Sequence, residues 1–171
     1  TDDSDTWYAR ASFLWDISDD ASALVMYSRQ EDTFSGDSIR RITDIQTNKG
    51  PKNTHDYDRL AEVEYETDLL SAEVAVDLGF ASFTSATSWS KAEVDSNIPG
   101  TELYEFLDQD ADLYFGFPRI SAEGHVFNED EVFTQEFRLV SQGDSNLDWI
   151  VGAFYKKQDK DGGFADNLPG Y

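Results

Sequence analysis

The feature that most constrains the fold of this chain is the alternation of short turns and long polar connections between segments of period-two hydrophobicity. Paired segments predict three antiparallel hairpins, at about residues 6–30, 68–94 and 132–158. Clusters of turn-forming residues separate the two arms within each hairpin. Longer polar loops are expected at about residues 31–57, 95–130 and 159–171. The pattern therefore predicts an all-β chain of about six strands, with every short turn at the same end.

The second and third hairpins show the alternation most clearly. In the second, Leu70, Ala72, Val74 and Val76 alternate with polar or small residues, and Leu78-Gly79 makes the turn. All four prolines fall outside the predicted strands, as expected for residues that cannot donate to a ladder; they are Pro51, Pro99, Pro118 and Pro169. Two segments stay open: Leu60–Thr67 either extends a strand or forms a short helix, and Glu102–Leu107 is a second candidate for a loop helix.

The arms are about nine to eleven residues long, which is the length that a tilted strand needs to cross a bilayer. Long loops are unusual in a compact soluble domain, whereas outer-membrane barrels combine short periplasmic turns with long extracellular loops. We therefore expect a segment of an antiparallel up-and-down transmembrane β-barrel over residues 1–171. No window is apolar enough for a membrane helix and no signal peptide precedes Thr1. The chain is then a mature form or an internal fragment.

Aromatic residues are spaced as the two interfacial girdles of such a barrel would require. Trp7 and Trp15, eight residues apart, share one side of their strand. Aromatics expected on the turn side are Trp15, Phe83 and Trp149, and those expected on the loop side are Trp7, Tyr27, Trp89 and Tyr155. The other face would point inward and carry mixed charge from Arg10, Glu73, Asp77, Glu136, Arg138, Asp148 and Lys156. Leu14, Ile150 and Phe154 interrupt this polar face and would pack against a plug or loop.

Composition excludes some functions. The net charge of −22 opposes binding to a nucleic-acid backbone, and the absence of cysteine excludes disulfides and thiolate metal sites. The sequence predicts no enzyme and no catalytic, cofactor-binding or metal-binding residue. His55 and His125 are expected to be solvated loop residues. Asp108–Asp112 alternates carboxylates but lacks the glycine and distal glutamate of a calcium-binding EF-hand loop, and Asp159–Gly163 is weaker still.

The third hairpin resembles a recurring hairpin of TonB-dependent receptors. Its first arm reads Gln-Glu-Phe-Arg-Leu-Val-Ser over residues 135–141, and its second reads Trp-Ile-Val-Gly-Ala-Phe-Tyr over residues 149–155. Asp77-Leu78-Gly79-Phe80-Ala81 in the second hairpin is similar to another stretch of these barrels. The resemblance covers about half of the chain.

That resemblance implies import of a scarce ligand, an iron chelate, cobalamin or sugar, across the bacterial outer membrane. A barrel of about 22 strands would enclose a plug domain and receive energy from the TonB complex. Expected partners are therefore TonB, outer-membrane lipid and a small-molecule ligand. The plug is absent from this chain, which would be an internal part of the barrel.

Two alternatives remain open. An acidic secreted β-sandwich that binds glycans would bury Trp15, Trp89 and Trp149 between two sheets, whereas a barrel would point them outward. A hydrolase on a β scaffold ranks last, because the sequence shows no convergent set of catalytic groups.

Overall fold

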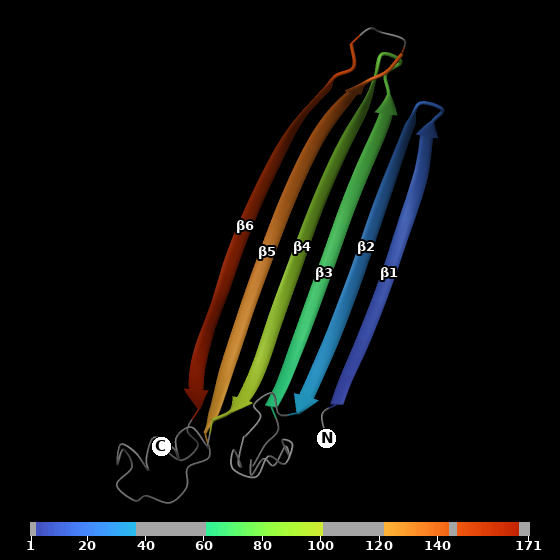
Figure 1. The fold of residues 1–171 in the computed structure, drawn as a ribbon. Helices are drawn as coiled ribbons and strands as arrows, with labels where there is room; N and C mark the ends of the chain where they lie inside the picture. The colour runs from blue at the N-terminus through green and yellow to red at the C-terminus, as the bar shows by residue number, and fades with distance from the viewer. Residues whose placement is uncertain (1–2, 37–60, 101–121, 144–146, 168–171) are drawn as a thin grey trace, which may run out of the picture.

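A computed structural model describes residues 3–36, 61–100, 122–143 and 147–167 of the chain. These residues form one open sheet of six antiparallel strands in sequence order (Figure 1). The strands are β1 (Asp3–Ser18), β2 (Ala21–Gly36), β3 (Ala61–Asp77), β4 (Ala81–Pro99), β5 (Glu123–Ser141) and β6 (Ile150–Asn167). The prediction of an all-β, up-and-down fold is confirmed. No helix in the described part of the chain is long and apolar enough to span a membrane.

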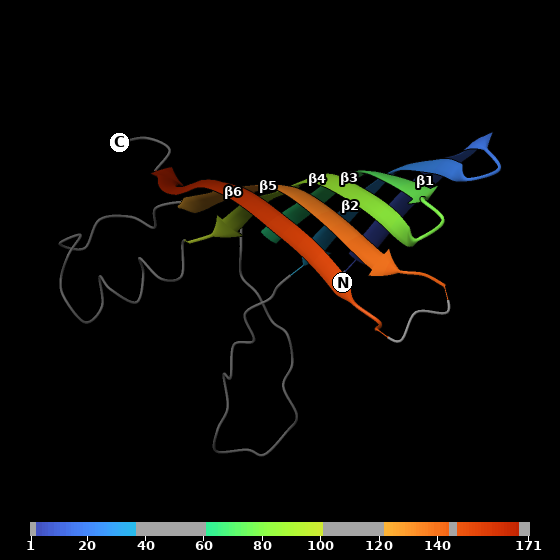
Figure 2. The same ribbon diagram turned by 90° about the horizontal axis from the view of Figure 1, so that it is seen from above.

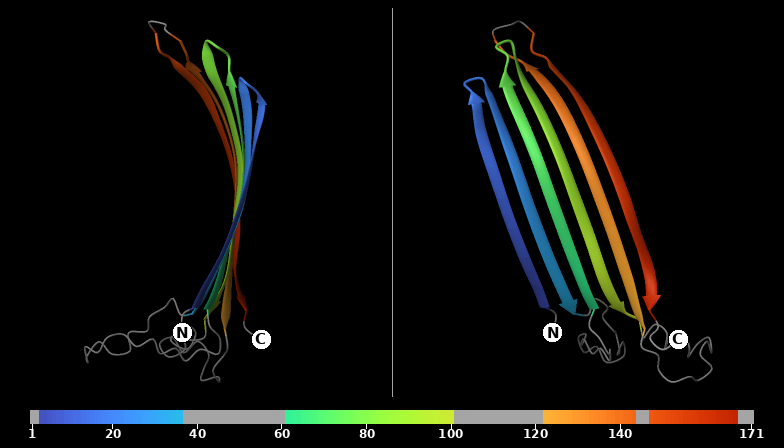
Figure 3. Two further views of the ribbon diagram at one scale, coloured as in Figure 1. Left: turned by 90° about the vertical axis from the view of Figure 1, so that its right-hand side faces the viewer. Right: turned by 180° about the vertical axis from the view of Figure 1, so that it is seen from behind.

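The three hairpins are those expected from the sequence. Asp19 and Asp20 join β1 to β2, and Gly79, with φ of 79°, allows the tight connection from β3 to β4. Neighbouring hairpins are linked there, because the Asp77 amide donates to the Asp20 carbonyl at 2.7 Å and the Gln142 amide donates to the Phe80 carbonyl at 2.9 Å. We call this end of the sheet the turn end and the other the loop end. The sheet twists strongly along its length (Figures 2 and 3).

The strands are much longer than predicted. They contain 16 to 19 residues rather than nine to eleven. Residues 31–36, 95–99, 123–130 and 159–167 are strand, although their polar composition predicted loop. From Ala61 onward the ambiguous segment before Asp68 is strand, not helix. Glu102–Leu107 lies outside the described residues. The reason for the error is that polar side chains on these extensions pair across strands, and so sustain the ladder without hydrophobic alternation.

Two single-residue expectations also fail. His125 lies within β5, opposite Asn97, rather than in a loop. Pro99 is the last residue of β4, where a missing amide donor interrupts the ladder least. The other three prolines and His55 lie outside the described residues.

The sheet has no second layer among the described residues. Its buried hydrophobic residues are all small, namely Ala61, Ala81 and Ala122, while large side chains such as Trp7 and Trp15 are 51% and 55% exposed. The two-sheet core expected of a β-sandwich is therefore not found in the described part of the chain. What the sheet presents instead is two broad faces.

Candidate functional site

One face of the sheet, which we call the indole face, carries the tryptophans at alternate positions. A row of directly paired residues crosses it through Tyr27, Leu70, Trp89 and Phe133. Tyr27, Leu70 and Phe133 are each more than a third exposed. On the turn-end side of this row the face is mainly apolar or small.

The outer aromatics do not lie on that row, and their offsets follow a consistent direction. Ala11 is opposite Tyr27, so Trp7 on β1 lies four residues nearer the loop end. Lys157 is opposite Phe133, so Tyr155 on β6 lies two residues nearer the turn end. From Trp7 to Tyr155 the loop-side aromatics thus shift by six residues over five strand steps, four of them between β1 and β2, while Tyr27 and Trp89 lie at one level. The mean slope is about 1.2 residues per strand, which is close to the slope of a flat line across strands tilted by about 40°.

The turn-side aromatics slope in the same sense. Trp15 is in register with Ser85 through β2 and β3, and Phe83 lies two residues nearer the turn end than Ser85. Trp149 precedes β6 and accepts a hydrogen bond from the Ser141 amide at 2.9 Å, two residues further still. The shift from Trp15 to Trp149 is four residues. The two lines are nearly parallel and enclose an apolar band. Its height, measured perpendicular to the lines, is about 15–20 Å.

Two aromatic residues of the loop-side line direct polar atoms at charged residues beyond it. The Tyr27 hydroxyl donates to Asp68 Oδ1 at 2.5 Å, and Trp89 Nε1 donates to Glu131 Oε1 at 2.7 Å. Amphipathic aromatic side chains adopt this arrangement where an apolar region meets a polar one. The line is thus a sharp boundary in side-chain chemistry.

Beyond the boundary, two rows of directly paired residues cross β2 to β6, and every residue in them has an ionisable side chain. The nearer row is Arg29, Asp68, Lys91, Glu131 and Asp159, and the further row is Glu31, Glu66, Glu93, Glu129 and Asp161. Like charges directly opposite each other are unfavourable, so the second row, which is entirely acidic, needs cations nearby.

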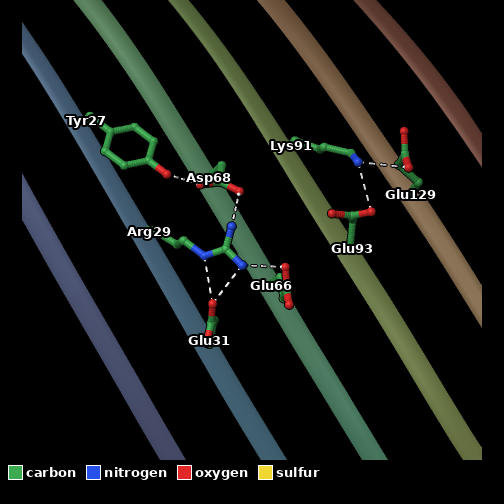
Figure 4. Close-up of polar contacts among 8 residues, drawn as sticks. All are labelled: Tyr27, Arg29, Glu31, Glu66, Asp68, Lys91, Glu93 and Glu129. Atoms are coloured by element: carbon green, nitrogen blue, oxygen red, sulfur yellow. Dashed lines mark hydrogen bonds and ion pairs between the residues drawn. The ribbon is translucent and has the colours of Figure 1, made fainter.

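Arg29 and Lys91 supply those cations (Figure 4). The Arg29 guanidinium lies 2.7 Å from Glu31, 2.8 Å from Glu66 and 3.3 Å from Asp68. Hydrogen bonding to Glu31, together with the charges of Glu66 and Asp68, raises the pKa of Arg29 above its usual value. Arg29 lies two residues beyond Tyr27 toward the loop end, and Lys91 lies two residues beyond Trp89.

Lys91 repeats the arrangement one hairpin further along. Its ammonium lies 2.9 Å from Glu93 and 3.1 Å from Glu129. Glu93 and then Glu129, as hydrogen-bond acceptors, raise the pKa of Lys91. The charged rows are therefore a cross-strand ion-pair network, which is worth more than isolated surface pairs.

Three polar side chains interrupt the apolar band, Gln135, Thr87 and Ser85, and they hydrogen-bond to one another. Gln135 accepts from the Thr87 hydroxyl, and its amide nitrogen donates to Ser85 Oγ and to two backbone carbonyls at 3.1 Å each. On the reverse side of the same strand pair, the Ser88 and Thr134 hydroxyls are 2.6 Å apart. The amide therefore ties β4 to β5 without leaving a polar atom unpaired.

The opposite face carries the charged residues that the sequence assigned to it. Register places Arg10, Glu73, Asp77, Glu136, Arg138 and Lys156 there. Asp148 precedes β6 and is not in a strand. Leu14 and Phe154 occur in one row with Glu73 and Glu136, and Leu14, Ile150 and Phe154 are 61–70% exposed. The assignment of these charged residues to one face is confirmed for those in strands, but that face also carries further apolar residues such as Leu24, Met26 and Val132.

A hollow of about 390 Å³ at the turn end is lined by Asp16, Asp19, Asp20 and Asp77. In the described part of the chain, no group of three or more histidine, cysteine or acidic residues is placed to hold a metal ion. Asp159–Gly163 is part of β6, and Asp108–Asp112 lies outside the described residues. The hollow is thus an acidic depression between two hairpins.

The fold and these faces define the described chain as a long antiparallel meander, with one face divided into an apolar band and a charged extension. No family model matches this sequence, and no curated protein is significantly similar to it. The resemblance to TonB-dependent receptors therefore rests on the hairpin residues themselves.

Proposed function

We propose that this chain forms part of the wall of an outer-membrane β-barrel, in a TonB-dependent receptor that imports an iron chelate, cobalamin or a sugar. The observation that carries the membrane assignment is the pair of sloping aromatic lines on the indole face. A soluble sheet has no reason to align aromatics along a plane oblique to its strands. A bilayer imposes such a plane, because strands tilt while its interfaces stay flat.

The boundary at Trp89 supports the same assignment. The face between the lines is mainly apolar or small, apart from the hydrogen-bonded group of Ser85, Thr87 and Gln135, and charged residues begin two positions beyond Tyr27 and Trp89. An outward apolar band flanked by aromatic girdles is what a barrel needs to contact lipid. The charged rows would then lie outside the membrane, where the strands continue toward the extracellular loops.

The import function is supported by the resemblance of the third hairpin and by the long connections at a single end of the sheet. Ligand would be captured by the loops and the inward face, and a plug would move when TonB transmits energy from the inner membrane. Each outer edge of the sheet, on β1 and β6, would be paired with further strands, since open edges are unfavourable in lipid.

Dependence on an amphiphile tests the membrane part. The full chain is refolded in buffer alone and in detergent micelles, and strand content is followed by far-ultraviolet circular dichroism. Cooperative β-structure only with detergent is expected, whereas a cooperatively unfolding monomer in buffer alone would refute the assignment. Uptake of labelled ferric chelate, cobalamin and oligosaccharide by cells with the natural protein, with and without a protonophore, tests import; uptake insensitive to the protonophore would refute TonB dependence.

A further inference from the structure

The opposite face becomes apolar at its loop end, where the indole face is charged. One row there consists of Phe34, Val63, Ser96, Val126 and Phe164, directly paired across β2 to β6. Val94 and Ile98 extend this floor on either side of Ser96 along β4. In the proposed barrel this face is turned away from lipid, so membrane insertion does not account for the apolar surface. We call these seven residues the mouth patch.

The aromatic residues of the mouth patch are held in place but remain accessible. Phe34 packs edge-on against Tyr65, with ring centroids 5.8 Å apart and planes at 83°. Phe164 covers Gly124, where a Cβ atom would come within 3.0 Å of the Phe164 ring. Phe34 and Phe164 are nevertheless 45% and 63% exposed. Two ordered rings thus flank the floor and leave surface free for a ligand.

Ser96 gives the patch a specific polar point. Ser96 is 7% exposed, and it is the buried polar residue of the described part of the chain. No described residue forms a hydrogen bond with its hydroxyl. A buried hydroxyl without a partner is unfavourable, and a ligand that supplies a donor or acceptor at the centre of the floor removes that cost.

The charge around the patch has one sign. Asp32 lies directly opposite Tyr65, and Asp166 lies directly opposite Gly124, at two corners of the floor. Within the described residues of the opposite face, no lysine, arginine or histidine occupies the patch row or the rows next to it. Exposed aromatic rings beside carboxylates favour a cation, through the ring quadrupole as well as through charge.

We propose that the mouth patch binds an amphipathic organic cation. A flat apolar body would lie over Val63 and Val126 between the phenylalanine rings. A hydrogen-bonding group would reach Ser96, and positive charge would face Asp32 and Asp166. The site goes beyond the proposed function by naming a further class of ligand, and it rests on that function for the orientation of this face away from lipid and for access from outside the cell.

The test measures fluorescence anisotropy of rhodamine 6G, a flat organic cation, with the full chain in detergent micelles. Fluorescein, a similar ring system with negative charge, is the matched probe, and empty micelles correct for partitioning. Phe164→Ser and Asp166→Asn alter the patch. Phe127→Ser is the control, because Phe127 lies over Gly163 on the indole face, close to the level of Phe164 along the strands.

Saturable binding of rhodamine 6G is expected, with fluorescein bound at least about tenfold more weakly. Phe164→Ser should weaken rhodamine binding by about tenfold and Asp166→Asn by about threefold, while Phe127→Ser leaves it unchanged. If the Phe164→Ser variant fails to fold, the Asp166→Asn variant still tests the site.

Equal binding of the two dyes, or equal loss in the Phe164 and Phe127 variants, would overturn the proposal. If detergent dependence is observed and rhodamine still fails to bind, this site alone is refuted and the membrane assignment stands.

Discussion

The indole nitrogen of Trp89 donates a 2.7 Å hydrogen bond to Glu131, the residue two positions beyond Phe133, its direct partner on β5. The bond runs diagonally across the strand pair, from the last aromatic of the apolar band to the first charged row. It therefore ties the apolar part of the sheet to its polar part at a single side chain. An indole at a bilayer interface needs this combination of an apolar ring and a satisfied N–H.

Trp89→Leu should lower the midpoint of thermal unfolding in detergent, because it keeps an apolar side chain but removes the indole ring and the N–H that donates to Glu131. Trp89→Tyr should recover part of the loss, since the tyrosine hydroxyl also places a polar atom at the boundary. A fall of about 2–5 °C is expected for the leucine variant, read from circular dichroism. A leucine variant as stable as the wild type would contradict an interfacial role for Trp89. A tyrosine variant less stable than the leucine variant would also contradict it.

Arg29→Ala should destabilise the loop-end half of the sheet more than Arg10→Ala. The first change leaves Glu31, Glu66 and Asp68 together without their cation, whereas Arg10 forms no ion pair with a described residue. Amide hydrogen exchange should accelerate in β2 and β3 beyond Tyr27 and stay unchanged toward the turn end. Acceleration spread evenly over the sheet would show that the charged rows are not a separate stabilising unit.

Gln135 and Thr87 should be coupled strongly, because a polar group in an apolar band is costly once its partner is gone. Gln135→Leu and Thr87→Val are each expected to lower the free energy of unfolding by about 1–2 kcal/mol. The double variant should lose clearly less than the sum of the two. The matched pair Ser88→Ala and Thr134→Val, on the other face of the same strands, shows whether coupling is confined to the apolar band. Additive losses for the Gln135 and Thr87 variants would show that the hydrogen bond between these two side chains does not couple β4 to β5.

Acid should remove a stabilising contact on the opposite face. Hydrogen bonding from Gln158, and then the charge of Lys160, lowers the pKa of Asp130, which lies beyond the loop-side aromatic line. A lowered pKa in the folded state means stability that is present above the ordinary value of about 4 and lost as the pH falls through the folded value. Asp130→Asn should therefore be less stable than the wild type at neutral pH, and the difference should shrink below about pH 4.

The control for that comparison is Glu136→Gln, on the same strand and face, where no ion pair is formed with a described residue. A difference between Asp130→Asn and the wild type that is constant with pH would contradict the assignment.

The hairpins and the two faces could be predicted from the sequence because hydrophobic alternation encodes them directly. Leu70, Val74 and Trp89 share the indole face as expected, and Gly79 makes its turn. Trp7, Trp15 and Tyr155 could be assigned to lines from their spacing alone. The slope of those lines could not, since it depends on cross-strand register, which no single strand records.

The charged extensions were missed for a different reason. Glu31, Glu129 and Asp161 lie in segments predicted as loops, because charged and polar residues dominate the composition of those segments. A signal was present: Glu66 and Asp68, Lys91 and Glu93, and Glu129 and Glu131 each continue the period of two on the same face. Their pairing becomes visible only once the strands are aligned, because each ion pair joins residues distant in sequence. The mouth patch was missed for the same reason, since Phe34, Ser96 and Phe164 come from three hairpins.

The most direct test of lipid contact uses two adjacent positions in the middle of β3. Ala72 lies on the indole face between Val25 and Thr87, whereas Ser71 lies on the opposite face between Met26 and Ser88. The chain has no cysteine, so Ala72→Cys and Ser71→Cys each carry a single nitroxide label after reconstitution of the full chain in phospholipid vesicles. Electron paramagnetic resonance then compares collisions with oxygen, which concentrates in hydrocarbon, and with a water-soluble nickel chelate. Lipid contact predicts that the label at 72 collides mainly with oxygen and the label at 71 mainly with the chelate; equal chelate accessibility at both positions would contradict it.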